Sequence, residues 1–203
     1  MKNFSRVCQR LESVPFHRDK AGILAGYLKD APVEDHSWAL YLLLGGQLPE
    51  LISPASAKSW ILAHSGLPDW LFETCREQTS DFSETVALWG GLSRDANRTD
   101  PVGESARGRS LRDWIELHLL PLAQATQPVR EAALFGWWQT LGLDLSWVVH
   151  ALCFGKFPVH ISRRIAEQAL RKAQGDAAIP GLNDQLSAKK ARLAEFAKQL
   201  ELF

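Results

Sequence analysis

The sequence predicts an all-α fold, a single compact domain of about ten helices. Apolar residues recur at spacings of three and four along most of the chain, which places them on one face of successive helices. Residues typical of helix ends, such as the pair Ser53–Pro54 and Gly66, separate these apolar blocks. The strand candidate, residues 157–161, is short and contains Pro158. Since strands and helices do not alternate, we expect helices packed on helices.

Six helices are expected in the first 90 residues. Ser53 followed by Pro54 is an N-cap with proline at the first helical position. Asp81 and Glu84 have the spacing of a capping box. The six helices are expected near residues 4–14, 23–28, 38–44, 54–65, 68–75 and 81–89.

A long loop and then five helices are expected in the rest of the chain. Residues 90–109 are polar, contain several glycines and show no apolar period, so they form the loop. Ser110 and Ser162 are expected N-caps. The helices are expected near residues 111–120, 128–141, 145–154, 162–174 and 186–200. We divide the chain into a helical domain, 1–175, and a linker with an amphipathic helix, 176–203.

The charges are balanced overall but uneven along the chain. There are 23 basic and 23 acidic residues, so the formal net charge is zero. Residues 94–112 nevertheless have a net charge of +2 and residues 150–172 of +4, while 1–93 and 113–149 are each at −3. Neutrality therefore does not exclude nucleic-acid binding, because local basic segments are present. A hydrophobic content of 46% is that of a globular protein and not of a disordered one.

Cysteine usage and hydropathy favour a cytoplasmic location. Cys8, Cys75 and Cys153 are odd in number and far apart, which is typical of reduced thiols. Apolar runs of about 18 residues, which a membrane span needs, are missing, and the N-terminus lacks the apolar segment of a secretory signal.

The common catalytic and metal-binding motifs are missing. The sequence contains neither a Walker nor a G-x-G-x-x-G phosphate loop, and no G-x-S-x-G nucleophile motif. His150 and Cys153 are three residues apart on an expected helix, but a second pair with metal-ligand spacing is lacking. We interpret the two as core residues and expect no metal, and no cofactor in this chain.

The segment 155–164 is the best candidate for a phosphate-binding site. A glycine turn leads to Ser162, which begins a helix whose N-terminal amides attract anions. Lys156, Arg163 and Arg164 add full positive charges, and His160 lies between them. A solvated helix start remains an equal alternative. A second basic group, for which plain loop solubility is the favoured reading, consists of Arg94, Arg98, Arg107 and Arg109.

Residues 147–170, which include that segment, resemble the end of the N-terminal DNA-binding domain of ATP-dependent DNA ligases. Four earlier stretches resemble the same domain in its bacterial form, encoded beside Lhr-type helicases, and they occur in the same order. They are 38–46 (Trp-Ala-Leu-Tyr-Leu-Leu-Leu-Gly-Gly), 67–73 (Leu-Pro-Asp-Trp-Leu-Phe-Glu), 81–88 (Asp-Phe-Ser-Glu-Thr-Val-Ala-Leu), and 111–116 with 119–122. The resemblance covers residues 1–175.

The resemblance implies a helical domain that holds double-stranded or nicked DNA through phosphates, without reading sequence. It places Lys156, Ser162 and Arg163 against the DNA backbone. Pro158 and His160 depart from the Arg and Gly that the bacterial relatives tend to have, which removes one expected phosphate contact.

No catalysis is expected from this chain alone. Ligases of this type are adenylated on a K-x-D-G lysine, and this motif is missing here. The closest string, 172–175, has Gln in place of Asp and is an ordinary helix end. ATP and Mg²⁺ are therefore expected only for a separate catalytic domain, which, with other repair proteins, is an expected partner.

The alternative function is a protein-interaction module that kept the ligase-type fold and lost DNA binding. The expected last helix offers an apolar stripe for a partner, although docking on its own domain is the favoured interpretation. The stripe consists of Leu186, Leu193, Phe196 and Leu200.

Overall fold

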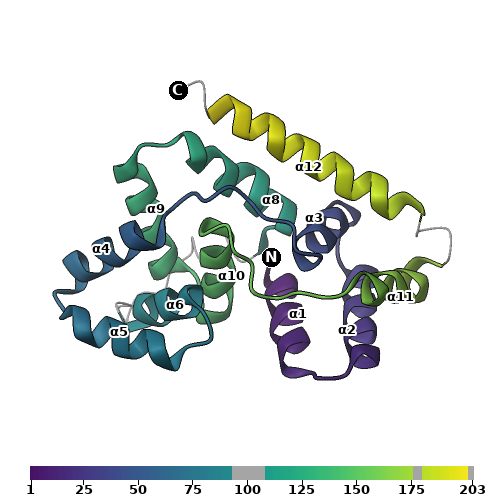
Figure 1. Cartoon of the computed structure of the whole chain (residues 1–203), viewed down its shortest axis with the longest axis horizontal. Coiled ribbons are helices and arrows are strands. Elements are labelled where there is room, and N and C mark those ends of the chain that lie inside the picture. The colour runs from purple at the N-terminus through teal and green to yellow at the C-terminus, as the bar shows by residue number, and fades with distance from the viewer. Residues whose placement is uncertain (93–107, 176–179, 201–203) are drawn as a thin grey trace. The chain divides into compact units, whose positions relative to one another are not determined.

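Figure 1 shows the computed structural model of the chain, in which every regular element described is a helix. The structure describes residues 1–92, 108–175 and 180–200, with the backbone alone at residues 17, 18, 91, 92, 180 and 196–200. Within these ranges there is no strand, which confirms the all-α prediction. No helix in them combines the length and the apolar character needed to cross a membrane.

Segments that alternate along the sequence form two compact units. Unit 1 comprises residues 1–47, 110–117 and 159–203, and unit 2 comprises residues 48–109 and 118–158. The chain therefore passes between the units four times. The segment 176–203, expected to be a linker and an amphipathic helix, is assigned to unit 1.

Unit 1 is organised around two central helices. The second helix of the chain lies between the first helix and α11, and the third helix contacts both α8 and α12. Large apolar side chains such as Phe4, Leu24 and Trp38 are fully buried in this unit. Its helices are α1 (Lys2–Ser13), α2 (His17–Asp30), α3 (Val33–Leu43), α8 (Leu111–Asp113), α11 (Arg163–Gln174) and α12 (Pro180–Leu200).

Unit 2 is organised around α6, which contacts the four other α-helices described in this unit. Its core includes Phe72, Val86 and Val148, all completely buried. The α-helices are α4 (Pro54–Ser65), α5 (Asp69–Gln78), α6 (Phe82–Leu92), α9 (Gln127–Thr140) and α10 (Leu143–Cys153). A π-helical turn, Trp114–Leu119, follows α8 and leads to a 3₁₀-helix, Leu120–Gln124.

Side-chain caps begin the helices at the expected positions. Ser53 Oγ accepts from the Ser56 N–H at 3.1 Å, and Ser110 Oγ accepts from the Asp113 N–H at 3.0 Å. Asp81 Oδ1 accepts from two backbone N–H groups in the first turn of α6, at 2.7 and 3.1 Å. These bonds satisfy amides that have no partner inside their helix, so the caps fix where α4, α6 and α8 begin.

The amphipathic helix α12 packs within unit 1. Leu182 and Leu193 are buried, and Leu186 is half-buried. The Lys189 ammonium lies 4.2 Å from the centre of the Trp38 ring, in a cation–π contact. This confirms the interpretation that the last helix docks on its own chain. The side chains of Phe196 and Leu200 lie outside the described residues.

The Glu116 carboxylate forms ion pairs with two basic side chains of α12. Its Oε1 lies 3.0 Å from Arg192 Nη1 and 3.6 Å from Lys189 Nζ. Burial alone would raise the pKa of Glu116, but hydrogen bonds from Trp38 and Arg112, together with the charges of the two α12 cations, lower it more, so the net pKa shift is downward. The carboxylate therefore stays ionised and keeps both cations of α12 in place.

Replacing Gly90 by alanine should destabilise unit 2. A Cβ at Gly90 in α6 would overlap the buried indole ring of Trp138 in α9. We expect Gly90→Ala to lower the free energy of unfolding by about 2 kcal/mol, because the overlap outweighs the better helix propensity of alanine. Urea denaturation measures this loss. Gly136→Ala in α9 is the control, since its Cβ would enter open space. Equal stability of both variants would contradict the tight α6–α9 packing.

Candidate nucleic-acid interface

The first turn of α11 presents the densest group of the predicted site residues. Ser162 is the N-cap, and its Oγ accepts from the Ile165 N–H at 3.4 Å. Arg163 and Arg164 follow, both exposed, and the first turn contains no acidic residue. Because the amide ends of a helix already bear partial positive charge, two arginines here concentrate positive potential.

The two arginines differ in their surroundings. Arg163 Nε lies 2.9 Å from Glu167 Oε1, and Arg163 Nη2 donates to Asn183 Oδ1 at 2.8 Å. This side chain therefore links α11 to the start of α12, and its charge is partly neutralised. For Arg164 the structure shows neither an ion pair nor a hydrogen bond to any described side chain. Arg164 is thus the better placed of the two to meet an external anion.

The rest of the segment is divided between the units. His160 is exposed in unit 1, beside Ile161, whose N–H donates to Leu43 O at 2.8 Å. Lys156 is exposed but belongs to unit 2. It follows Gly155, whose φ of +67° is the left-handed conformation that glycine favours. His160, Ser162, Arg163 and Arg164 therefore belong to unit 1, and Lys156 belongs to unit 2.

The second predicted basic group is described at one position. Arg109 is half-buried in unit 2, and its guanidinium is hydrogen-bonded to the imidazole of His118. This contact shows that Arg109 has a role inside unit 2. Arg94, Arg98 and Arg107 lie outside the described residues.

The division into units separates the charges that cancel over the whole chain. The segments of unit 1 contain 15 basic and 12 acidic residues, and those of unit 2 contain 8 and 11. The formal charges are therefore +3 and −3. Unit 1, which contains the first turn of α11, is the basic half of the protein.

An internal repeat, visible in the sequence at an offset of 109, relates the two units. Residues 35–62 align without gaps on residues 144–171, and nine of the 28 pairs are identical. Each copy is a helix, a glycine turn and a second helix: α3 with α4, and α10 with α11. The shared residues of the first copy are Asp35, Ser37, Trp38, Leu43, Gly46, Pro49, Ile52, Ser53 and Ala57.

The structure gives the repeated residues matching roles. The indole N–H of Trp38 donates to Glu116 at 2.9 Å, and that of Trp147 donates to Asp81 at 3.0 Å. Ser53 and Ser162 each cap the second helix of their copy.

Backbone bonds repeat as well, each inside its own unit. In unit 1 the Ile161 N–H donates to Leu43 O, the last residue of α3. In unit 2 the N–H of the equivalent Ile52 donates to Cys153 O at 3.3 Å, the last residue of α10. The two copies therefore exchange their second helices. In unit 1, α3 of the first copy is with α11 of the second, and in unit 2, α10 of the second copy is with α4 of the first.

A comparison of the two copies shows whether the hairpin needs its basic residues for folding. Lys156, Arg163 and Arg164 align with Gln47, Pro54 and Ala55, which are uncharged. The serine cap, a left-handed turn glycine (Gly45 in the first copy, Gly155 in the second) and most buried positions are common to both copies, so the hairpin folds without basic residues. The positive charge of the second copy is therefore an addition to the shared fold.

The buried pair on α10 has no metal-site geometry. His150 and Cys153 are completely buried. Burial lowers the pKa of His150 to about 3 and raises the pKa of the Cys153 thiol. Among the described residues, no group of three or more His, Cys, Asp or Glu side chains could hold a metal ion.

Comparison with known proteins leaves the family of this chain open. No protein-family model matches the sequence, and no curated protein is significantly similar to it.

Proposed function

We propose that this chain binds the phosphate backbone of duplex DNA, without sequence preference, through the first turn of α11. The observation that supports this most is the contrast within the repeat. Two hairpins share a fold, and only the second has exposed arginines at the capped helix start, in the basic unit. Arginine and N-terminal amides are the donors that phosphate oxygens prefer. Such contacts position a protein on DNA without reading its bases.

The link to ligation depends on the resemblance described above. If it holds, the chain assists nick sealing by holding the duplex, and a separate catalytic domain supplies ATP, Mg²⁺ and the adenylated lysine. Double-stranded or nicked DNA is then the ligand, and that catalytic domain or another repair protein is the partner.

The alternative, a protein-interaction module, loses part of its support. The described apolar side chains of α12 pack inside unit 1, with Leu182 and Leu193 buried. They do not form an exposed stripe for a partner. An interaction module remains as one outcome of the DNA-binding test.

Replacing Arg164 by glutamate should weaken duplex binding at least about tenfold, because it turns one phosphate contact into a repulsion. The slope of log K against log salt should also fall by about one. Fluorescence anisotropy with labelled nicked and intact duplex, at two or more salt concentrations, measures both.

Ala55→Glu is the matched control for this experiment. Ala55 occupies the equivalent position in the first turn of α4 and is exposed, so the variant adds a negative charge at the same place in the other copy. We expect it to leave binding within about twofold of the wild type. Equal binding by Arg164→Glu and the wild type would overturn the site. Lack of binding by the wild type would favour the interaction module.

A further inference from the structure

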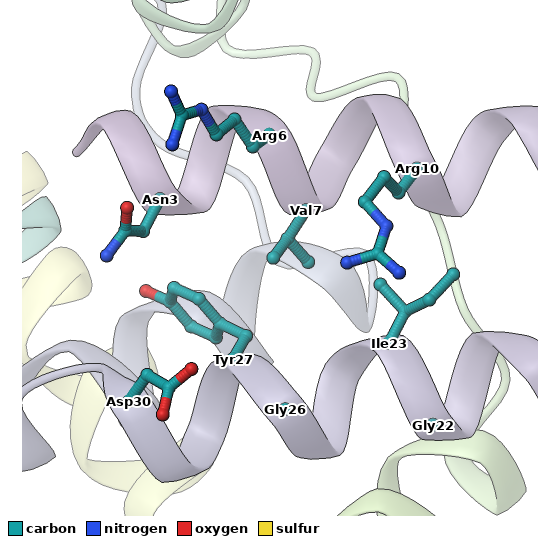
Figure 2. Close-up of a pocket in the computed structure, with 9 residues that line it drawn as sticks. All are labelled: Asn3, Arg6, Val7, Arg10, Gly22, Ile23, Gly26, Tyr27 and Asp30. Atoms are coloured by element: carbon teal, nitrogen blue, oxygen red, sulfur yellow. The ribbon is translucent and has the colours of Figure 1, made fainter.

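A groove lies between α1 and α2 in unit 1 (Figure 2), and none of the predicted DNA-binding residues lines it. Its volume is about 460 Å³. Side chains of α1 form one wall and α2 forms the floor. The lining residues are Asn3, Arg6, Val7, Arg10, Gly22, Ile23, Gly26, Tyr27 and Asp30.

Two glycines open the floor of the groove. Gly22 and Gly26 are one helical turn apart on α2, so they occupy the same face. A Cβ built at either position would meet no atom within 4 Å. Close packing therefore does not require glycine here, although glycine in a helix interior costs about 1 kcal/mol relative to alanine. What the two glycines provide is access to the α2 backbone.

The opposite wall is basic. Arg6 and Arg10 are one turn apart on α1, and both are exposed. The structure shows no ion pair of either side chain with a described residue. In Figure 2 the Arg10 guanidinium reaches toward α2 beside Ile23 and Gly22. The carboxylate of Asp30 lies at the other end of the groove, so the end at Arg10 is the favourable one for an anion.

A buried hydroxyl without a partner lies at the Asp30 end. Tyr27 is 5% exposed, and its Oη has no hydrogen-bond partner among the described residues. Buried phenol groups are normally hydrogen-bonded. Burial also raises the pKa of Tyr27, so the hydroxyl stays protonated and can donate. Figure 2 shows it pointing between Asn3 and Asp30, which are themselves polar. This end therefore suits the hydrogen-bonding portion of a ligand.

We propose that the α1–α2 groove binds a phosphate-bearing ligand, with the phosphate at Arg10 above the Gly22–Gly26 floor. Two sources share this chemistry: the backbone of the duplex held by α11, and a free phosphorylated small molecule. The first source deepens the proposed function and rests on it. The groove and α11 belong to the same unit, in which α2 contacts both α1 and α11.

The test is a titration of ¹⁵N-labelled full-length chain with inorganic phosphate and, separately, with a 20-base-pair duplex. We expect phosphate to shift the amide signals of Gly22 and Gly26, and the shifts to disappear in Arg10→Gln. Gly26→Ala should also remove them, because its methyl group fills the floor. Gly136→Ala in α9 is the control for a glycine-to-alanine change in open space and should bind as the wild type does. A thermal melt of each variant verifies folding.

The duplex arm separates the two sources and the two proposals. A roughly tenfold loss of duplex affinity in Arg10→Gln identifies the DNA backbone as the ligand. Groove shifts with phosphate but unchanged duplex affinity identify a small phosphorylated molecule. If neither phosphate nor duplex shifts the groove amides while Arg164→Glu still weakens duplex binding, the groove proposal is overturned and the proposed function stands. If phosphate shifts the groove amides but the chain binds no duplex, the groove proposal stands and the proposed function is overturned.

Discussion

Replacing Arg130 by alanine should lower the free energy of unfolding by about 3 to 5 kcal/mol, because one guanidinium serves four backbone carbonyls in unit 2. Arg130 Nε donates to two carbonyl oxygens at 3.0 Å, Nη1 donates to a third at 2.8 Å, and Nη2 donates to a fourth at 2.7 Å. The acceptors are, in the same order, Leu122, Ala125, Leu51 and Ala123.

These carbonyls have few other partners. Three of them lie at the end of the 3₁₀-helix Leu120–Gln124 or just after it, where many carbonyls have no partner inside the helix, although Leu122 O also accepts from the Ala125 N–H at 3.0 Å. The fourth, Leu51 O, lies in the connector that follows α3 in the chain. Arg130 thus holds two distant segments together, and its loss leaves part-buried carbonyls unsatisfied.

Lysine should not rescue this position. Its single ammonium cannot reproduce the planar fork that bonds four oxygens, so Arg130→Lys should recover less than half of the loss. Arg76→Ala is the control, since Arg76 is an exposed arginine on α5 of the same unit. Urea denaturation followed by tryptophan fluorescence measures all three variants. A loss in Arg130→Ala no larger than in Arg76→Ala would contradict this account.

The starts of α4, α6, α8 and α11 could be predicted because local caps decide them, whereas α2, α3 and α12 begin five or six residues before the expected positions. Ser53, Asp81, Ser110 and Ser162 were expected caps, and each accepts the N–H bond that a cap requires. The expectation of a continuous helix over residues 111–120 was also only partly right. α8 ends at Asp113 and continues as a π-helical and then a 3₁₀-helical turn. Pro121 has no N–H to donate, which helps to explain why regular α-helical bonding does not continue.

The exchange of segments between the units could not be predicted from local patterns. Helical periodicity shows that α4 and α11 exist, but not which unit each one joins. Long-range bonds decide that, such as Ile161 N–H to Leu43 O within unit 1. The repeat at an offset of 109 is nevertheless visible in the sequence alone, as an internal self-similarity.

The candidate site was predictable in composition but not in detail. The basic segment identified Arg163 and Arg164 together, and their residue types give no reason to separate them. The difference arises because Asn183, 20 residues away, accepts a hydrogen bond from Arg163. The α1–α2 groove could not be predicted from the segment charges, because Arg6 and Arg10 lie in the acidic segment 1–93. Whether an arginine has an ionic partner depends on tertiary contacts, which composition does not contain.

The buried imidazole of His150 should make the protein acid-sensitive. The ring lies between Trp138 and Phe154, with ring centres 6.3 and 6.2 Å away. Its Nδ1 is 3.5 Å from Ser146 Oγ, and its Nε2 has no partner among the described residues. Burial lowers the pKa of His150 in the folded protein to about 3, against an ordinary value of 6.5. Folding therefore requires the neutral ring.

The sign of the effect follows from proton uptake. Between pH 6.5 and pH 3 the unfolded chain binds one more proton at His150 than the folded chain does, so stability falls as the pH falls. This difference amounts to about 3 kcal/mol at pH 4 relative to pH 8. In His150→Phe, which cannot titrate, the loss of unfolding free energy between pH 8 and pH 4 should be smaller by that amount. His160→Gln, a change at an exposed position, is the control and should lose as much unfolding free energy as the wild type. Urea denaturation at pH 8, 6, 5 and 4 measures the three profiles. Parallel profiles for the wild type and His150→Phe would show that His150 finds a proton acceptor or water in the folded state.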